Sequence, residues 1–415
     1  MAKKILLMDT LSTIHVGNGA LLENTIKLCK DAYGEDCEFN IITMDKQTNE
    51  LKYDKNNLYN PMFGGFWFGL GKLGKLFWAI KNSLFMILHI INENTIKIKS
   101  ERLTFTKEQK EAITIINDSD ICVSCGGEII GDTYCQALPF WLFTYWLAIK
   151  KGKKFILFPQ SVGPLNKKWT RFLVYHSLKN ASLLVGRDKP SFDTLISLGF
   201  QRDKIMFVPD VAIQQKLADA DIYKYFSNKE RKIIGITISN PPHHEIGEKV
   251  DFVEKVSNQA EQLDNEKYQI LIMPSNYKID GISKDYELCL ELKDKLSKKF
   301  EVSILENRAY FPDEYISLLN QLELFISTRM HVAILATTTY TPTIAINTQH
   351  KIMGYMKNIN MEHFCVEYKD LNNIFILMEE IISNRKELSE KLKLENQKLK
   401  KEHEVFISRL KDISK

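Results

Sequence analysis

Short apolar runs alternate with longer stretches of helical period through the first half of the chain. Each run is followed by turn residues and then by a segment whose apolar side chains recur every three to four positions. This alternation is typical of βαβ units and a mostly parallel sheet. The expected strands are 5–8, 39–43, 121–124, 155–158, 183–186 and 205–208. The expected helices are 19–33, 107–117, 138–150, 168–181 and 189–199.

The alternation stops after the last of these strands and then begins again. Residues from about 211 to 231 are polar and lack a strong period, which makes them the best linker candidate. Beyond them we expect strands at 233–239, 268–273, 302–305, 324–327 and 343–346, with helices at 250–263, 284–300, 313–322 and 330–338. We therefore predict an α/β fold of two Rossmann-like, doubly wound domains, residues 1–212 and 213–415. Ligands bind open α/β sheets at the carboxyl ends of the strands, so the two domains should face a central cleft.

An insertion at about 61–100 interrupts the first domain and is rich in Gly, Phe, Trp and Leu. A membrane-spanning helix needs about twenty mostly apolar residues, and Lys72, Lys75 and Lys81 break this run. A buried helix is the simpler interpretation. The alternative is an amphipathic surface that contacts a membrane peripherally, near a lipid-linked acceptor.

The last residues of the chain, beyond 384, are rich in Lys and Glu. Leu392, Leu399, Phe406 and Ile413 recur one heptad apart within them. This pattern indicates a solvated terminal helix with one narrow apolar stripe. A helix that contacts a second subunit is the weaker interpretation, because strong coiled coils need two apolar positions per heptad.

Composition places the chain among ordinary globular proteins, at 415 residues with 44% hydrophobic content. The net charge of +4 is small, so nucleic acid is not an expected partner. The start of the chain leads straight into a strand without a secretory signal, which favours a cytoplasmic protein, with the inner face of the membrane as an alternative. Cys122 and Cys125 match a C-x-x-C pattern inside an apolar strand and are expected to be buried thiols. The adjacent His243 and His244 lack a third ligand, so no metal is assigned.

Polar residues and glycines follow successive strands of the first domain, where an open α/β sheet would place a site. The full G-x-G-x-x-G fingerprint is absent, so a dinucleotide is not favoured. Each position alone is also explained by a plain turn or a helix cap. Their coincidence on successive strand ends is what points to a site. The candidates are Asn18, Gly126, Gly127, Gln160, Ser161, Arg187, Asp188 and Asp210.

The second domain carries a cation and a titratable ring at the end of strand 324–327. Arg329 and His331 open the helix that follows, and Lys351 comes after the next strand. A helix N-terminus binds anions, and an imidazole exchanges protons near neutral pH. These residues therefore predict a site for a small polyanion with a general acid beside it.

The series from Gly126-Gly127 through Gln160-Ser161, Arg187-Asp188, Asp210 and Arg329-Met330-His331 to Lys351 resembles the polysaccharide pyruvyl transferase family in order and extent. The resemblance implies a two-lobed, GT-B-like fold similar to that of glycosyltransferases. It also implies transfer of a pyruvyl group from phosphoenolpyruvate to sugar hydroxyls, as a ketal, in cell-surface polysaccharide biosynthesis. Ala20, Glu128 and Pro159 depart from the family's pattern, which leaves the acceptor less certain than the donor.

Phosphoenolpyruvate carries a carboxylate and a phosphate, and a site for it needs fixed cations. Arg187, Arg329 and Lys351 would supply these cations, and His331 fits a general acid. The resemblance also implies that His331, Arg187 and Lys351 are catalytic. Arg329, Gly126, Gly127 and Ser161 are expected to bind the donor. Asn18, Gln160, Asp188 and Asp210 are expected to bind the acceptor or support the site, and Arg329 could instead pair with Asp188 or Asp210. No cofactor is expected besides phosphoenolpyruvate as co-substrate.

Two other functions remain open at this level. One is a GT-B-type glycosyltransferase that uses a nucleotide sugar, for which residues 276–285 could line a pocket. The other is a non-catalytic scaffold of a polysaccharide assembly complex. The acceptor saccharide, its nucleotide or lipid carrier, and the oligomeric state are left open.

Overall fold

The computed structural model describes residues 2–64, 70–239, 251–278, 280–348 and 350–414, so His243 and His244 lie outside the described residues. The chain forms two compact units. Unit 1 contains the residues up to Thr13, the segment Thr25–Asp210 and the residues from His403 onward. Unit 2 contains Ile14–Asn24 and Val211–Glu402. The predicted boundary after residue 212 lies close to Asp210, but the sequence did not predict that each unit includes a segment from the other half of the chain.

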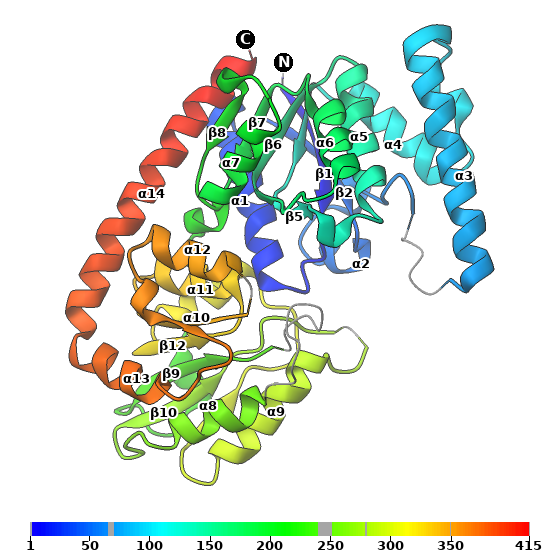
Figure 1. Ribbon diagram of the computed structural model, residues 1–415. Coiled ribbons are helices and arrows are strands. Elements are labelled where there is room, and N and C mark those ends of the chain that lie inside the picture. Colours follow the sequence, from blue (N-terminus) through cyan, green and yellow to red (C-terminus); the bar gives the residue numbers. More distant parts are fainter. Residues whose placement is uncertain (1, 65–69, 240–250, 279, 349, 415) are drawn as a thin grey trace. The chain divides into compact units, whose positions relative to one another are not determined.

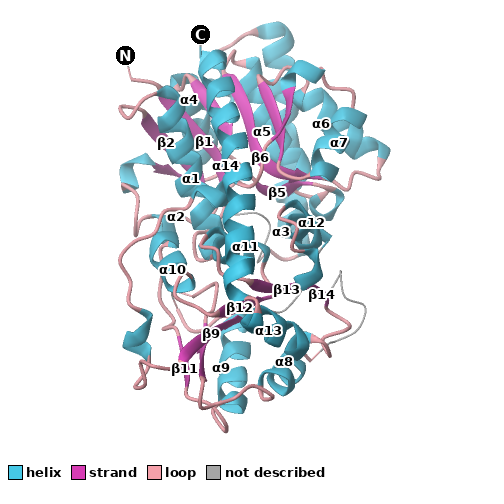
Figure 2. Cartoon of the chain, turned by 90° about the vertical axis from the view of Figure 1, so that its left-hand side faces the viewer, coloured by secondary structure: helices cyan, strands magenta, loops and turns pink. Residues whose placement is uncertain are grey.

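Unit 1 is built on a parallel sheet with strand order β3-β2-β1-β4-β6-β7-β8. The short strand β5 pairs with the carboxyl end of β6, beyond the part that pairs with β4. Figure 2 shows its strands in one layer, with helices packed around them. The strands are β1 (Lys4–Thr10), β2 (Glu38–Thr43), β3 (Leu58–Tyr59), β4 (Ile121–Ser124), β5 (Gly127–Ile130), β6 (Lys154–Val162), β7 (Leu183–Gly186) and β8 (Ile205–Phe207). The helices are α1 (Val16–Tyr33), α2 (Lys46–Asn49), α3 (Lys72–Ile91), α4 (Lys107–Asp118), α5 (Leu138–Lys150), α6 (Lys168–Leu178) and α7 (Lys189–Ser197).

The central strands of unit 1 are buried on both faces. Every residue of β4 and β7 is buried, as is every residue of β6 after the first. Parallel strands covered by helices on both sides read as continuous apolar runs, which is why the sequence located them well. Cys122 and Cys125 are buried free thiols at β4, as expected.

Unit 2 has a second parallel sheet, with strand order β11-β10-β9-β12-β13-β14. Its strands are β9 (Lys232–Thr237), β10 (Tyr268–Ile272), β11 (Val302–Ile304), β12 (Leu324–Ser327), β13 (Thr343–Asn347) and β14 (Cys365–Glu367). Its helices are α8 (Phe252–Ala260), α9 (Lys284–Leu296), α10 (Pro312–Leu319), α11 (Met330–Thr338), α12 (His350–Asn358) and α13 (Ile374–Ser383). Both units are therefore doubly wound α/β folds, as predicted (Figure 1).

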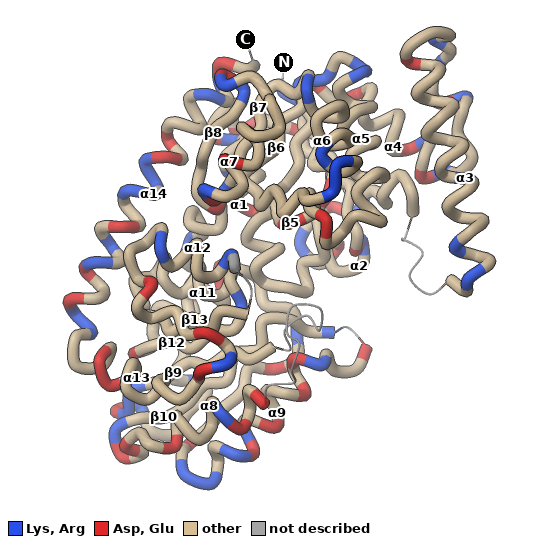
Figure 3. Tube along the Cα trace, viewed as in Figure 1, with Lys and Arg blue, Asp and Glu red and all other residues tan. Residues whose placement is uncertain are grey.

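The last helix, α14 (Arg385–Ser414), belongs partly to each unit. Leu392 is fully buried in the core of unit 2, and Phe406 packs against Phe158 of β6 in unit 1 with ring centroids 5.0 Å apart. Figure 3 shows Lys, Arg, Asp and Glu alternating along the same helix. The expectation of a solvated helix is therefore correct for its charged side only, because the heptad stripe is used for packing within the chain.

Several other details differ from the sequence prediction. The expected linker starts with buried residues, since Val211, Ala212 and Ile213 are fully buried in unit 2. Strand β6 runs on to Val162, so Gln160 and Ser161 lie in the strand and not in a turn after it. Their polar side chains interrupt the apolar run, and this hid the last part of the strand.

Candidate active-site residues

The unit 1 candidates meet at the carboxyl end of the sheet. Arg187, which follows β7, donates from Nε to Ser161 Oγ at 2.9 Å and from a terminal nitrogen to Asp210 Oδ2 at 2.9 Å. Asp210 follows β8, and the two charged side chains are only 2% and 4% exposed. A buried ion pair of this kind is held in one geometry, because separating it would leave an uncompensated charge.

Asp188 connects this pair to the helix that follows β7. One of its carboxylate oxygens accepts a hydrogen bond from Ser161 Oγ at 3.0 Å, and the other caps α7 through the Ser191 amide at 2.8 Å. Ser191 Oγ in turn accepts from the amide of Val162 in β6 at 2.9 Å. Asp188 is therefore both a helix cap and a hydrogen-bond partner of Ser161, and its supporting role in the site stays a prediction.

Gln160 is fully buried, and its side chain amide lies 3.4 Å from Ser124 Oγ. Ser124 donates to Asp9 Oδ2 at 2.5 Å, and Tyr145 also donates to that oxygen. Burial raises the pKa of Asp9, while these hydrogen bonds act in the opposite direction. Gln160 thus belongs to a polar cluster inside unit 1, and its acceptor or supporting role stays a prediction. Sequence reasoning missed this cluster, since Asp9 lies within an apolar strand.

The two glycines after β4 allow the chain to turn and continue as β5. Gly126 and Gly127 have φ values of +92° and +115°, which L side chains rarely adopt. A Cβ at Gly126 would lie 2.6 Å from the carbonyl oxygen of Pro159. Close backbone packing against β6 explains Gly126, and the positive φ explains Gly127, while donor binding by either glycine stays a prediction.

In unit 2, Arg329 is the N-cap residue of α11, directly after β12. Its guanidinium donates to Asp285 Oδ2, and the same oxygen accepts from Asn276 Nδ2 at 3.0 Å. Asn276 is fixed in turn by Ser283, whose hydroxyl donates to its Oδ1 at 2.7 Å. The structure pairs Arg329 with Asp285 of the same unit, where the sequence had left open a pair with Asp188 or Asp210.

His331 lies in the first turn of α11 and packs against the first turn of α1. A Cβ built on Gly17 would lie 2.4 Å from Cβ and 3.2 Å from Nδ1 of His331, so only a glycine leaves room for this approach. The neighbouring His15 pairs with Asn276 through an isolated β-bridge. Burial lowers the pKa of His15 to about 4, helped by the positive charge of Arg329 and opposed by Asp285. His15 is therefore neutral at physiological pH.

Lys351 stands in the first turn of α12, after β13, and is partly exposed. Strands β12 and β13 are parallel neighbours, and Thr348 Oγ1 donates to the Thr328 carbonyl at 3.2 Å. The carboxyl ends of these two strands, with Arg329, His331 and Lys351, therefore share one edge of the unit 2 sheet. Asn18 lies one residue after Gly17 in α1, in the segment that belongs to unit 2.

Apart from Gly126 and Gly127, which follow β4 in unit 1, the candidates fall into two groups. Arg187, Asp188, Asp210, Gln160 and Ser161 form the group in unit 1, and Arg329, His331, Lys351 and Asn18 form the group in unit 2. Sequence reasoning missed His15, the close approach of Gly17 to His331 and the pair between Asp285 and Arg329. Among the residues that the structure describes, no cluster of three or more His, Cys, Asp or Glu could hold a metal ion.

The family comparison covers both groups. Residues 15–350 match the family model described as polysaccharide pyruvyl transferase. The chain belongs to the polysaccharide pyruvyl transferase family. The match begins at His15 and includes every site candidate except Lys351, which follows its last residue directly. A curated relative, the amylovoran biosynthesis protein AmsJ of Erwinia amylovora, is 22% identical over 405 residues, with 94% of each chain covered. The chain is thus a pyruvyl transferase family member with a role in polysaccharide biosynthesis.

Solved structures show that the fold is GT-B-like. The UDP-GlcNAc 2-epimerase from Neisseria meningitidis, solved with bound UDP-GlcNAc, has a TM-score of 0.56 at 12% identity, with 98% of this chain and 99% of that chain covered. The Burkholderia multivorans trehalose 6-phosphate synthase has a TM-score of 0.54 at 9% identity, with 100% and 99% covered. At this identity the likeness extends to the fold alone.

Proposed function

We propose that the protein transfers the pyruvyl group of phosphoenolpyruvate to two hydroxyl groups of a saccharide, forming a pyruvate ketal. The observation that carries the proposal is the family match over residues 15–350, which includes Arg187, Arg329 and His331. The relative in amylovoran biosynthesis supports a polysaccharide as the class of product.

The donor is held, in this proposal, at the edge of the unit 2 sheet where two helices begin. Phosphoenolpyruvate carries close to three negative charges at neutral pH, and helix N-termini offer N–H groups without an intrahelical partner. Arg329 caps α11, and Lys351 lies in the first turn of α12. The Arg329 side chain is 36% exposed although it is paired with Asp285, so an anion can reach it. Asp285 then serves to orient the guanidinium.

Arg187 contributes differently, because Asp210 compensates its charge within unit 1. Two hydrogen bonds, to Ser161 and Asp210, fix the plane of its guanidinium before any ligand binds. A group fixed in this way stabilises charge without reorganising during the reaction. We therefore keep Arg187 as a catalytic candidate whose guanidinium is fixed within unit 1, and we assign most of the ground-state donor affinity to Arg329 and Lys351.

The reaction needs one proton on carbon and two new carbon–oxygen bonds. His331, as imidazolium, gives its proton to the methylene carbon of phosphoenolpyruvate, and the electron-poor C2 that results is attacked by the first sugar hydroxyl. The hydroxyl proton returns to the imidazole. The second hydroxyl then bonds to C2 as the C2–O bond to phosphate breaks, and phosphate leaves with the second hydroxyl proton as hydrogen phosphate. General acid catalysis of this kind contributes about 10²–10⁴-fold.

The test is incubation with phosphoenolpyruvate labelled in its pyruvyl carbons and a pool of glycan precursors. We expect label in a saccharide and one phosphate released for each pyruvyl group incorporated. His331→Ala should lower turnover by about 10²–10⁴-fold, the contribution of a general acid, while thermal unfolding stays unchanged. His363→Ala is the matched control, because His363 is an exposed histidine of the same unit that pairs with Glu380.

A ligand-binding measurement separates this proposal from nucleotide-sugar chemistry. A ligand that binds only the folded state raises the unfolding midpoint. Phosphoenolpyruvate should raise the midpoint, and Arg329→Ala should reduce that shift. The proposal fails if UDP-sugars raise the midpoint, phosphoenolpyruvate does not, and no precursor pool yields labelled saccharide.

A further inference from the structure

Helix α3 of unit 1 exposes a long row of large apolar side chains. Leu73 and Phe77 are 72% and 71% exposed, and six more apolar residues of the helix are at least 45% exposed. Figure 1 shows α3 at the periphery of unit 1. We call this row the α3 apolar face; it consists of Leu73, Leu76, Phe77, Ile80, Leu84, Ile87, Ile90 and Ile91.

The α3 apolar face forms one continuous stripe. At about 100° per residue, its eight side chains fall within an arc of about 140°. On the same projection Lys72 lies at one margin of the arc and Lys81 at the other, and both lysines are exposed. In Figure 3 most of the helix is free of charged residues. An apolar stripe with basic margins fits the boundary of a lipid bilayer, where apolar acyl chains lie beneath anionic headgroups.

The opposite side of α3 is packed against unit 1. Asn82 and Phe85 are buried there. Asn82 Oδ1 accepts from Gln109 Nε2 of α4 at 3.2 Å, and the Phe85 ring lies 5.9 Å from the Phe63 ring in an edge-to-face arrangement. The predicted buried helix is therefore correct for this side only. By length and composition Lys72–Ile96 could cross a membrane, but crossing would break the hydrogen bond between Asn82 and Gln109 and place the Asn82 side chain in lipid.

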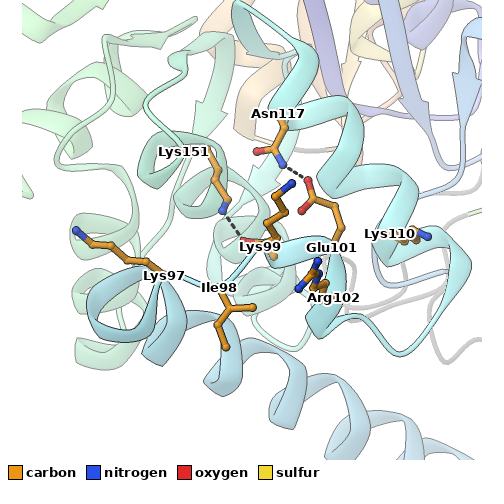
Figure 4. A pocket seen from close by; sticks show the side chains of 9 residues that line it. Lys97, Ile98, Lys99, Glu101, Arg102, Lys110, Asn117 and Lys151 are labelled. Carbon is orange, nitrogen blue, oxygen red and sulfur yellow. Dashed lines mark hydrogen bonds between the residues drawn. The ribbon is translucent and has the colours of Figure 1, made fainter.

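Further basic residues follow the end of α3. A shallow pocket there is lined by Lys97, Lys99 and Arg102 from the segment after the helix, with Lys110 from α4 and Lys151 after α5. Lys151 pairs with Glu93 at 2.6 Å. Figure 4 shows Lys97 and Lys110 extended at opposite ends of the pocket. Cations therefore accompany the apolar face at both ends of the helix, where lipid phosphates would lie.

We propose that α3 docks the protein on an anionic phospholipid bilayer. The α3 apolar face enters the boundary between headgroups and acyl chains, and the lysines at its margins and ends contact the lipid phosphates. The helix lies along the surface and does not span, because its inner side stays packed on unit 1. A membrane-bound saccharide would then be close to the enzyme, independently of which transfer reaction the site performs.

The test is flotation of the full-length protein with phosphatidylcholine vesicles that contain, or lack, phosphatidylglycerol. The protein should float with the anionic vesicles and lose this at high salt, which screens the lysines. The double variant Phe77→Asp/Ile80→Asp should lower the partition coefficient between vesicles and water by about tenfold or more, because it places two charges in the part of the α3 apolar face that enters the membrane. Phe172→Asp/Leu394→Asp is the control with the same change of net charge, at exposed apolar residues of α6 and α14.

Three outcomes would overturn the proposal. The wild-type protein does not float with anionic vesicles, or both double variants float equally well. In the third outcome the wild-type protein does not bind vesicles and light scattering shows that it is a dimer, whereas the Phe77→Asp/Ile80→Asp variant is a monomer. That last result would assign the α3 apolar face to a second copy of the chain.

Discussion

Replacing Gly17 by alanine tests the position of His331 without altering any side chain that would touch the substrate. The new methyl group would lie 2.4 Å from Cβ and 2.9 Å from Cγ of His331. Non-bonded carbon atoms prefer a separation of about 3.5–4.0 Å. One of the two helices, α1 or α11, or the imidazole itself must therefore move by about 1 Å, the difference between these distances.

The expected consequence is large for activity and small for stability. A displacement of about 1 Å in a catalytic group can lower the rate by about 10²-fold. Overpacking destabilises by about 1–3 kcal/mol, and alanine in a helix is favoured over glycine by about 1 kcal/mol, so the net loss should be about 0–2 kcal/mol.

Two measurements check this expectation. Phosphate release from phosphoenolpyruvate with the precursor pool reports activity, and urea denaturation reports the free energy of unfolding. Gly354→Ala is the matched control, since Gly354 is a glycine of helix α12 in the same unit, and among the described residues nothing beyond its own helix backbone lies within 4 Å of where a Cβ would stand. It should keep full activity and gain stability by about 0.5–1 kcal/mol.

A double variant shows whether Gly17→Ala lowers activity by displacing His331. In a His331→Ala background, Gly17→Ala should lower activity no further, because no imidazole is left to misplace. The reasoning is refuted if Gly17→Ala retains wild-type activity in a folded protein. It is also refuted if the two substitutions lower activity independently.

Two further predictions concern stability. The pKa of His15 is about 4 in the folded protein, against an ordinary value of 6.5. Between these pH values only the unfolded chain binds a proton at this residue. The free energy of unfolding should therefore fall by about 1.4 kcal/mol for each pH unit as the pH drops from 6.5 to 4. His15→Asn should flatten that dependence relative to wild type in urea titrations at several pH values. Asp210→Asn should destabilise unit 1 by about 3–5 kcal/mol, because it removes the carboxylate that pairs with the buried Arg187 guanidinium. Glu266→Gln, at the exposed pair with Arg231, should change stability by less than about 1 kcal/mol, and equal effects at both pairs would contradict the burial argument.

The fold was predictable because its strands are buried on both faces. Strands at 121–124, 183–186 and 324–327 were predicted with the bounds that the structure has. Continuous apolar runs mark such strands clearly. The last residues of β6 were missed, because Gln160 and Ser161 are buried through hydrogen bonds, which leave no apolar signal.

The candidate site was predictable only where its residues follow strands. Arg187, Arg329 and His331 could be found in this way, since the carboxyl ends of strands are the binding edge of such sheets. Asp285 could not, because it is 44 positions away from Arg329 and pairs with it only in the folded chain. The requirement for glycine at position 17 likewise becomes visible only when His331 is placed beside it.

The exchange of segments between the units decides how the protein can be dissected. A gene cut after Asp210 would give a first product without Phe406 and a second without His15 and Gly17. The first product would lack the Phe406 ring that packs on Phe158, and the second would lack the first turn of α1, which contacts His331 through Gly17. Faithful halves would need the 14–24 segment grafted onto one product and the residues from 403 onward onto the other.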